Sequence, residues 1–113
     1  MPFINTKTTA ALSSAKKESL STQIINITRE CLGKGENWVM TSFEDNASLS
    51  FQGSTADIAY IEVKTFGTPS AAGASQMTAK LSALLERELS ISSERIYIGY
   101  FPTDKWGWNG SNF

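Results

Sequence analysis

The sequence predicts an α+β fold made of two tandem βαβ units, and three patterns support this prediction. Apolar and polar residues alternate in short segments typical of strands, apolar residues recur every three or four positions in two long segments typical of helices, and the order strand, helix, strand occurs twice. Right-handed crossovers place both helices on one face of a four-stranded mixed sheet. The 113 residues are expected to form one domain, 1–113.

The first predicted unit starts near the N-terminus. Residues 3–7 alternate as a short strand, and a helix is expected from an N-cap at Ser13 or Ser14 to a C-terminal cap at Gly33. Residues 37–44 complete the unit as a second strand. The buried stripe of the helix is expected to contain Leu20, Ile24, Ile27 and Cys31.

The second predicted unit follows a shorter strand over 49–52. Its first strand spans 56–66, its helix starts after Ser70 and ends near Leu89, and its last strand spans 95–101. The first of these strands should bury Ala59, Ile61 and Val63, and the helix should bury Met77, Leu81, Leu84, Leu85 and Leu89.

Composition and charge narrow the possible partners. The net charge of -1 is spread along the chain, so no basic face is visible for a nucleic acid or a membrane surface. There is no apolar run of about 20 residues and no secretory signal, so a cytoplasmic location is expected. The chain has no histidine and a single cysteine, which argues against a zinc site or a disulfide. Partners are therefore expected to be small molecules or other protein chains.

Two surfaces of the predicted fold need a cover. Strands 37–44 and 56–66 carry apolar residues on both sides, so the face without helices should pack against copies of the chain in a closed homo-oligomer. Residues 105–113 carry two of the three tryptophans among glycines. This tail fits equally a hairpin at the domain edge and a segment that lines a pocket or a subunit boundary.

Pro2 is the candidate general base. If Met1 is removed, Pro2 presents a secondary amine instead of an amide, and without histidine no other candidate base is apparent. If Met1 is kept, the nitrogen of Pro2 is a tertiary amide without basicity. The Met-Pro dipeptide alone is not specific for catalysis, so evidence for a catalytic role of Pro2 has to come from the rest of the sequence.

Five short sequence blocks give more specific evidence than the Met-Pro dipeptide. Together they extend over essentially the whole chain. They are Met1-Pro2, Leu32-Gly33-Lys34, Phe51-Gln52-Gly53-Ser54-Thr55, Arg95-Ile96-Tyr97-Ile98 and Gly107-Trp108-Asn109-Gly110-Ser111. In this order and spacing the chain resembles the macrophage migration inhibitory factor (MIF) family of the tautomerase superfamily. The resemblance implies a homotrimer with an active site at each subunit boundary, no cofactor, and tautomerisation of phenylpyruvate-type aryl keto acids.

The resemblance also implies roles for individual residues. Pro2 is expected to act as catalytic base and acid, Lys34 and the backbone N–H of Phe66 to hold the substrate carboxylate, and Tyr97 of a neighbouring subunit to line the pocket. Gly99 replaces an asparagine of vertebrate members, which affects selectivity for hydroxylated substrates. The remaining lining is expected from Phe3, Trp38, Trp106 and Phe113.

These residues also have plain structural interpretations. Lys34 follows a helix end, where a lysine complements the helix dipole, and aromatics such as Phe66 and Tyr97 are common on strands. For catalysis at neutral pH, the pKa of the Pro2 amine must be lowered, and burial and the charge of Lys34 both act in that direction. The alternatives to a tautomerase are a cytokine-like protein, released without a signal peptide and bound by a receptor, and a purely structural trimer.

Overall fold

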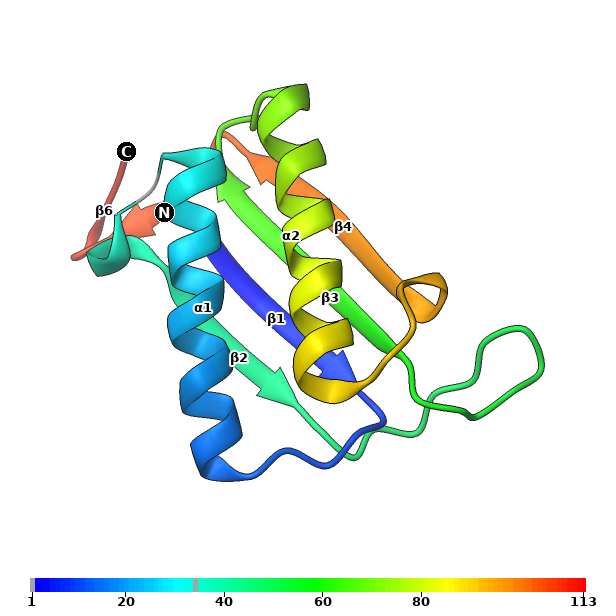
Figure 1. Cartoon of the computed structure of the whole chain (residues 1–113). Coiled ribbons are helices and arrows are strands. Elements are labelled where there is room, and N and C mark those ends of the chain that lie inside the picture. The colour runs from blue at the N-terminus through cyan, green and yellow to red at the C-terminus, as the bar shows by residue number, and fades with distance from the viewer. Residues whose placement is uncertain (1, 34) are drawn as a thin grey trace.

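The protein contains a four-stranded sheet with the strand order β2-β1-β3-β4 (Figure 1). The computed structural model describes residues 2–33 and 35–113, so Lys34 lies outside the described residues. β1 is parallel to β2, β3 is parallel to β4, and the antiparallel pair β1 and β3 joins the two halves. The doubled βαβ prediction is therefore confirmed. The strands are β1 (Pro2–Thr8), β2 (Met40–Glu44), β3 (Ala59–Phe66) and β4 (Ile96–Thr103).

Two helices, α1 (Ser14–Leu32) and α2 (Ala71–Leu89), cover one face of the sheet, as predicted. Ser13 and Ser70 cap their N-termini, because each hydroxyl accepts a backbone N–H of the first turn. Gly33 ends α1 at φ +69°, a left-handed conformation that glycine adopts without strain. None of the described helices combines the length and the apolar character needed to cross a bilayer.

The core lies between the helices and the sheet. The predicted face of β3 is confirmed, and so is that of α2 except at Leu89, which is only half-buried. The stripe of α1 also differs from the prediction. Thr28 is fully buried, and its hydroxyl is satisfied there by donating to the carbonyl of Ile24 at 2.8 Å, whereas Ile27 and Cys31 are only half-buried. The largest fully buried side chains are Ile4, Leu20, Ile24, Ile61, Met77, Leu81, Leu84, Leu85 and Ile91.

The two helices approach closely at Gly73, which is buried in the first turn of α2. A Cβ atom on Gly73 would lie 2.5 Å from the carbonyl oxygen of Cys31 and 2.9 Å from Oγ of Ser70. Because real Cβ atoms do not come so close to a backbone oxygen, the helix contact requires glycine here.

The predicted strand over 37–44 is too long at its start. Glu36–Trp38 forms a 3₁₀ helix, η1, in which the N–H of Trp38 donates to the carbonyl of Gly35, and β2 begins only at Met40. The ring of Trp38 packs against Trp108 of the tail, so this turn takes part in a contact with a distant segment.

The predicted strand over 49–52 is wrong. Phe51 and Ser54 form both hydrogen bonds of a tight turn whose central residues, Gln52 and Gly53, have φ of 53° and 73°. These positive φ values are incompatible with an extended strand. β3 likewise starts at Ala59 and not at residue 56, because residues 51–57 form a loop.

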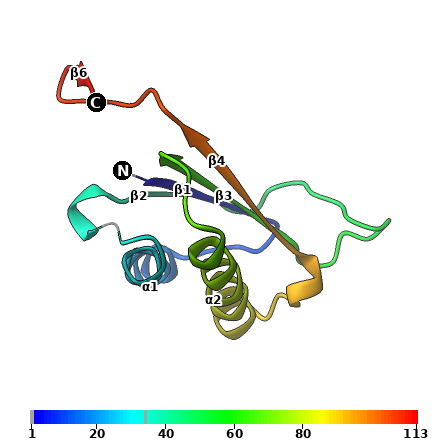
Figure 2. The same ribbon diagram turned by 90° about the horizontal axis from the view of Figure 1, so that it is seen from above.

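One face of the sheet lacks helices (Figure 2), and we call it the open face. It carries both exposed apolar and hydrogen-bonded polar side chains. Near its middle, the amide nitrogen of Asn5 donates to Glu44 and its amide oxygen accepts from Ser42, each at 2.7 Å. The open face also carries exposed apolar side chains, with exposed fractions of 66% for Met40 and 62% for Tyr97.

Candidate active site

Pro2 lies buried at the first position of β1, where it pairs with Thr65 near the end of β3. Phe66 follows Thr65 as the last residue of β3, and its ring lies 5.5 Å from the ring of Phe113. The structure therefore brings together Pro2, Phe66 and Phe113, three residues that the sequence assigns to the site. We call this region the proline end of the sheet.

The tail crosses the proline end from β4 towards η1 (Figures 1 and 2). It forms a hairpin, one of the two arrangements that the sequence left open, from two short strands, β5 (Gly107–Trp108) and β6 (Ser111–Asn112). The N–H of Phe113 donates to the carbonyl of Trp106 at 3.0 Å, which fixes the chain terminus beside Phe66.

Trp108 is a member of this aromatic group that sequence reasoning missed. Its ring meets the predicted lining residue Trp38 edge-on, with centroids 5.0 Å apart, whereas Trp106 is half-buried. The glycine-rich block 107–111 contained the only signal for it, since a tryptophan within a hairpin needs a packing partner.

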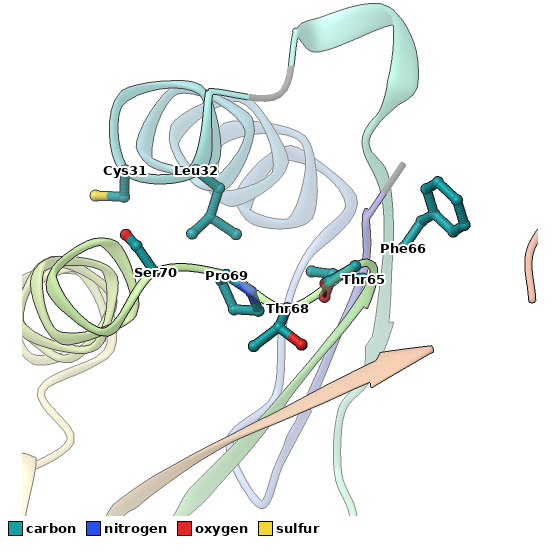
Figure 3. A pocket seen from close by; sticks show the side chains of 8 residues that line it. Cys31, Leu32, Thr65, Phe66, Thr68, Pro69 and Ser70 are labelled. Atoms are coloured by element: carbon teal, nitrogen blue, oxygen red, sulfur yellow. Dashed lines mark hydrogen bonds between the residues drawn. The ribbon is translucent and has the colours of Figure 1, made fainter. Parts of the chain in front are cut away.

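A cavity of about 400 Å³ lies beside the proline end, between the end of α1, the end of β3 and the loop that leads into α2 (Figure 3). Cys31 and Leu32 line it from α1, and the ring of Phe66 points away from them. Lys34, the predicted carboxylate ligand, comes two residues after Leu32 and lies outside the described residues.

The electrostatics of this end do not favour a cysteine nucleophile. Burial raises the pKa of the Cys31 thiol, so the thiolate is scarce at neutral pH.

Phe3, a predicted lining residue, is half-buried on the open face beside the exposed Lys64, with which it pairs. Within residues 2–33 and 35–113 no group of three or more histidine, cysteine or acidic side chains is placed to hold a metal ion.

Tyr97 does not join the other predicted site residues. It pairs with Tyr60, whereas Pro2 pairs with Thr65, and these two positions of β3 are separated by about 17 Å along the strand. Tyr97 lies at the opposite end of the open face, which we call the tyrosine end. A cavity of about 150 Å³ opens there beside Tyr97, Phe51 and Tyr60.

Gly99, the predicted site of altered selectivity, lies on β4 beneath two aromatic side chains. A Cβ atom at this position would be 2.9 Å from the ring of Phe101 and 3.3 Å from the hydroxyl of Tyr60. These side chains occupy the space that a larger residue at 99 would fill, so this part of the open face is aromatic.

Comparison with known proteins agrees with this geometry. The family model of macrophage migration inhibitory factor (MIF) matches residues 1–113. The crystal structure of MIF2 from Leishmania major is 42% identical, with a TM-score of 0.95 over 100% of this chain and 97% of that one. A homologue from Prochlorococcus marinus is 33% identical, with a TM-score of 0.88 over 98% of each chain. Macrophage migration inhibitory factor of Meriones unguiculatus is 28% identical over 100% of this chain and 99% of its own length.

Proposed function

Because the chain belongs to the macrophage migration inhibitory factor family, we propose that it is a keto–enol tautomerase for phenylpyruvate-type aryl α-keto acids. The observation that carries the proposal is the burial of Pro2 at the end of the sheet where Phe66 and Phe113 gather. A flat aryl acid fits an aromatic site of this kind better than a polar or highly charged substrate does.

The chemistry needs one group that moves a proton. In ketonisation the enol oxygen loses a proton and the carbon beside the carbonyl gains one, so the substrate and product differ only in the position of that proton. The Pro2 amine, once Met1 is removed, gives and takes this proton. Its burial favours the neutral form of the amine over the charged form, as a general base at neutral pH requires.

Lys34 and the backbone N–H of Phe66 are proposed to bind the substrate carboxylate. Lys34 follows Gly33, the cap of α1, and the cavity beside that helix end is lined by both Leu32 and Phe66. A lysine supplied from this segment would neutralise the carboxylate and would also disfavour protonation of Pro2.

A homotrimer completes the proposed site, with Tyr97 supplied by a neighbouring subunit. Two observations support this assembly. Tyr97 lies too far from Pro2 to reach it within one chain, and the open face carries exposed apolar residues such as Met40. Packing between copies of the chain would cover these residues.

The test is the rate at which the purified protein ketonises the enol of phenylpyruvate, after intact-mass measurement has verified that Met1 is absent. Replacement Pro2→Gly should lower kcat by about 10²-fold or more, because it removes the secondary amine of the general base. Pro102→Gly is a matched control, since Pro102 is exposed on β4 in register with Thr65 and offers no terminal amine. An unchanged rate in Pro2→Gly would refute the mechanism.

The family also includes cytokine-like members, which gives a second candidate function. The same variant separates the two. Receptor binding by the trimer surface would persist in Pro2→Gly, whereas tautomerisation would not.

A further inference from the structure

We propose that Arg95 and the loop it holds, residues 51–57, position Tyr97 for substrate binding. We call this unit the Arg95 clasp. The proposal rests on the proposed function, because that function assigns Tyr97 to the substrate pocket of a neighbouring subunit. Arg95 itself is a positioning residue, since it acts on Tyr97 through the ring of Phe51.

The guanidinium of Arg95 binds the loop through its backbone. All four hydrogen bonds go to carbonyl oxygens, and they involve Nε and both terminal nitrogens of the side chain. The acceptors are Phe51 at 3.3 Å, Ser54 at 3.1 Å, Ala56 at 3.0 Å and Asp57 at 3.1 Å.

This arrangement needs the planar fork of arginine. A lysine has a single ammonium with three donors, so it cannot reach four carbonyls spread over seven residues of the loop. The guanidinium carbon of Arg95 also lies 5.7 Å from the centroid of the Phe51 ring, within the range of a cation–π interaction. Arg95 therefore contacts both the backbone of the loop and a ring that packs against Tyr97.

Phe51 links the ordered loop to Tyr97 through a contact between their rings. The two rings meet edge to face, with centroids 5.0 Å apart and an interplanar angle of 66°. Tyr97 is 62% exposed, and no side-chain hydrogen bond holds its hydroxyl in the described part of the chain. The contact with Phe51 is thus the interaction best placed to restrict the orientation of the Tyr97 ring.

The position of the clasp predicts which kinetic constant it affects. In the proposed mechanism Pro2 moves the proton. The Arg95 clasp lies at the tyrosine end, on the subunit that would supply Tyr97 to the site of its neighbour. Loosening the clasp should therefore weaken substrate binding and leave the proton-transfer group in place. Replacement Arg95→Lys should raise KM roughly threefold to tenfold, as expected for the loss of one ordered aromatic contact, and should change kcat by less than about twofold.

Two further variants separate positioning from folding. Phe51→Leu keeps every hydrogen bond of Arg95 and removes only the ring, so it should raise KM as Arg95→Lys does, whereas Phe51→Tyr should keep the KM of the original chain. Arg87→Lys is the matched control, because Arg87 is exposed on α2 and donates to Gln23. Oligomeric mass and thermal stability of each variant establish that the assembly is intact.

A double-mutant cycle tests whether Arg95 acts through Tyr97. In a Tyr97→Ala background, Arg95→Lys should have no further effect on KM, because the contact is already absent. If Tyr97→Ala raises KM and Arg95→Lys either leaves KM unchanged or adds its full effect, the clasp is overturned while the proposed function stands.

A second readout is independent of activity. The chain has three tyrosines, so labelling with 3-fluorotyrosine gives three fluorine resonances, and Tyr97→Phe identifies that of Tyr97. Arg95→Lys and Phe51→Leu should shift this resonance and leave that of Tyr100 in place, since Tyr100 is bound to Thr78 and Ala74. An unmoved Tyr97 resonance overturns the clasp. If the original chain lacks tautomerase activity, the proposed function fails and the fluorine spectrum alone decides whether Arg95 positions Tyr97.

Discussion

The two ends of the open sheet face are organised in different ways. At the proline end, aromatic rings contributed by β3, η1 and the tail pack against one another, as in the pairs Phe66–Phe113 and Trp38–Trp108. At the tyrosine end, one charged side chain, Arg95, orders a loop through four backbone carbonyls. One end is built from contacts between aromatic rings, and the other from hydrogen bonds between one side chain and a loop backbone.

This difference suggests a division of work between subunits. In the proposed mechanism, proton transfer by Pro2 would benefit from apolar surroundings, whereas substrate recognition by Tyr97 would require a fixed orientation of its ring. The chain carries both parts, but about 17 Å of β3 separates them. A site that uses both therefore has to combine the proline end of one chain with the tyrosine end of another.

Mixing two defective chains would test this division most directly. Pro2→Gly and Tyr97→Ala chains, unfolded together and refolded, should recover activity at low substrate concentration. If subunits assemble at random, roughly a quarter of the sites combine an intact Pro2 with an intact Tyr97. Separately refolded chains mixed afterwards are the control. If co-refolding gives no more activity than that control, Pro2 and Tyr97 do not share a site across subunits.

Replacement Gly73→Ala should weaken the contact between α1 and α2 that lies beside the proline end. The added methyl group would push the start of α2 away from the carbonyl of Cys31, which should lower the free energy of unfolding by about 1–3 kcal/mol. Gly35→Ala is the control, because a Cβ atom there meets nothing closer than 4.0 Å. Urea denaturation at one protein concentration measures the free energy of unfolding of both variants. Equal stability of the two variants would show that the helices can separate at Gly73 without cost.

Acid should weaken the tyrosine end more than the proline end. A backbone N–H from Leu12 and the ammonium of Lys17 lower the pKa of Asp45, which follows β2 at that end, below its ordinary value of 3.8. Its contribution to stability is present above this value and is lost as pH falls through the lower folded-state pKa. At the proline end, the pKa of Glu30 is lowered by the exposed Lys80.

Melting temperatures measured from about pH 6 to about pH 3 would compare the contributions of these two carboxylates to stability. Asp45→Asn should flatten the acid-induced decrease more than Glu30→Gln does, because Asp45 also accepts from the backbone. The reverse order would show that the ion pair on the helices contributes more than the link between α1 and the end of β2.

The helices and the central strands could be predicted because their signals are local. Ser13, Gly33 and Ser70 mark helix ends by their own backbone preferences, and Ile61 and Val63 mark the buried face of β3 by alternation. Of the candidate site, the proximity of Pro2, Phe66 and Phe113 followed from matching the chain to a known family.

What the sequence did not reveal depends on contacts between distant segments. Residues 37–39 leave the predicted strand where Trp38 meets Trp108, and residues 49–52 run into the turn 51–54 that Arg95 binds. An arginine at the start of a strand gives no indication that four carbonyls more than 35 residues earlier will accept its hydrogen bonds. Such features appear only once the chain is folded.

The antiparallel pairing of β1 with β3 has a consequence for how the protein folds. This central pair joins residues as distant in sequence as Pro2 and Thr65, and a whole helix separates the two strands of each parallel pair. No hairpin between neighbouring strands can start the sheet, so the chain must close long loops before the strands gain any hydrogen bonds. We therefore expect slow folding for a protein of this size, with a transition state in which the two halves have already met along β1 and β3.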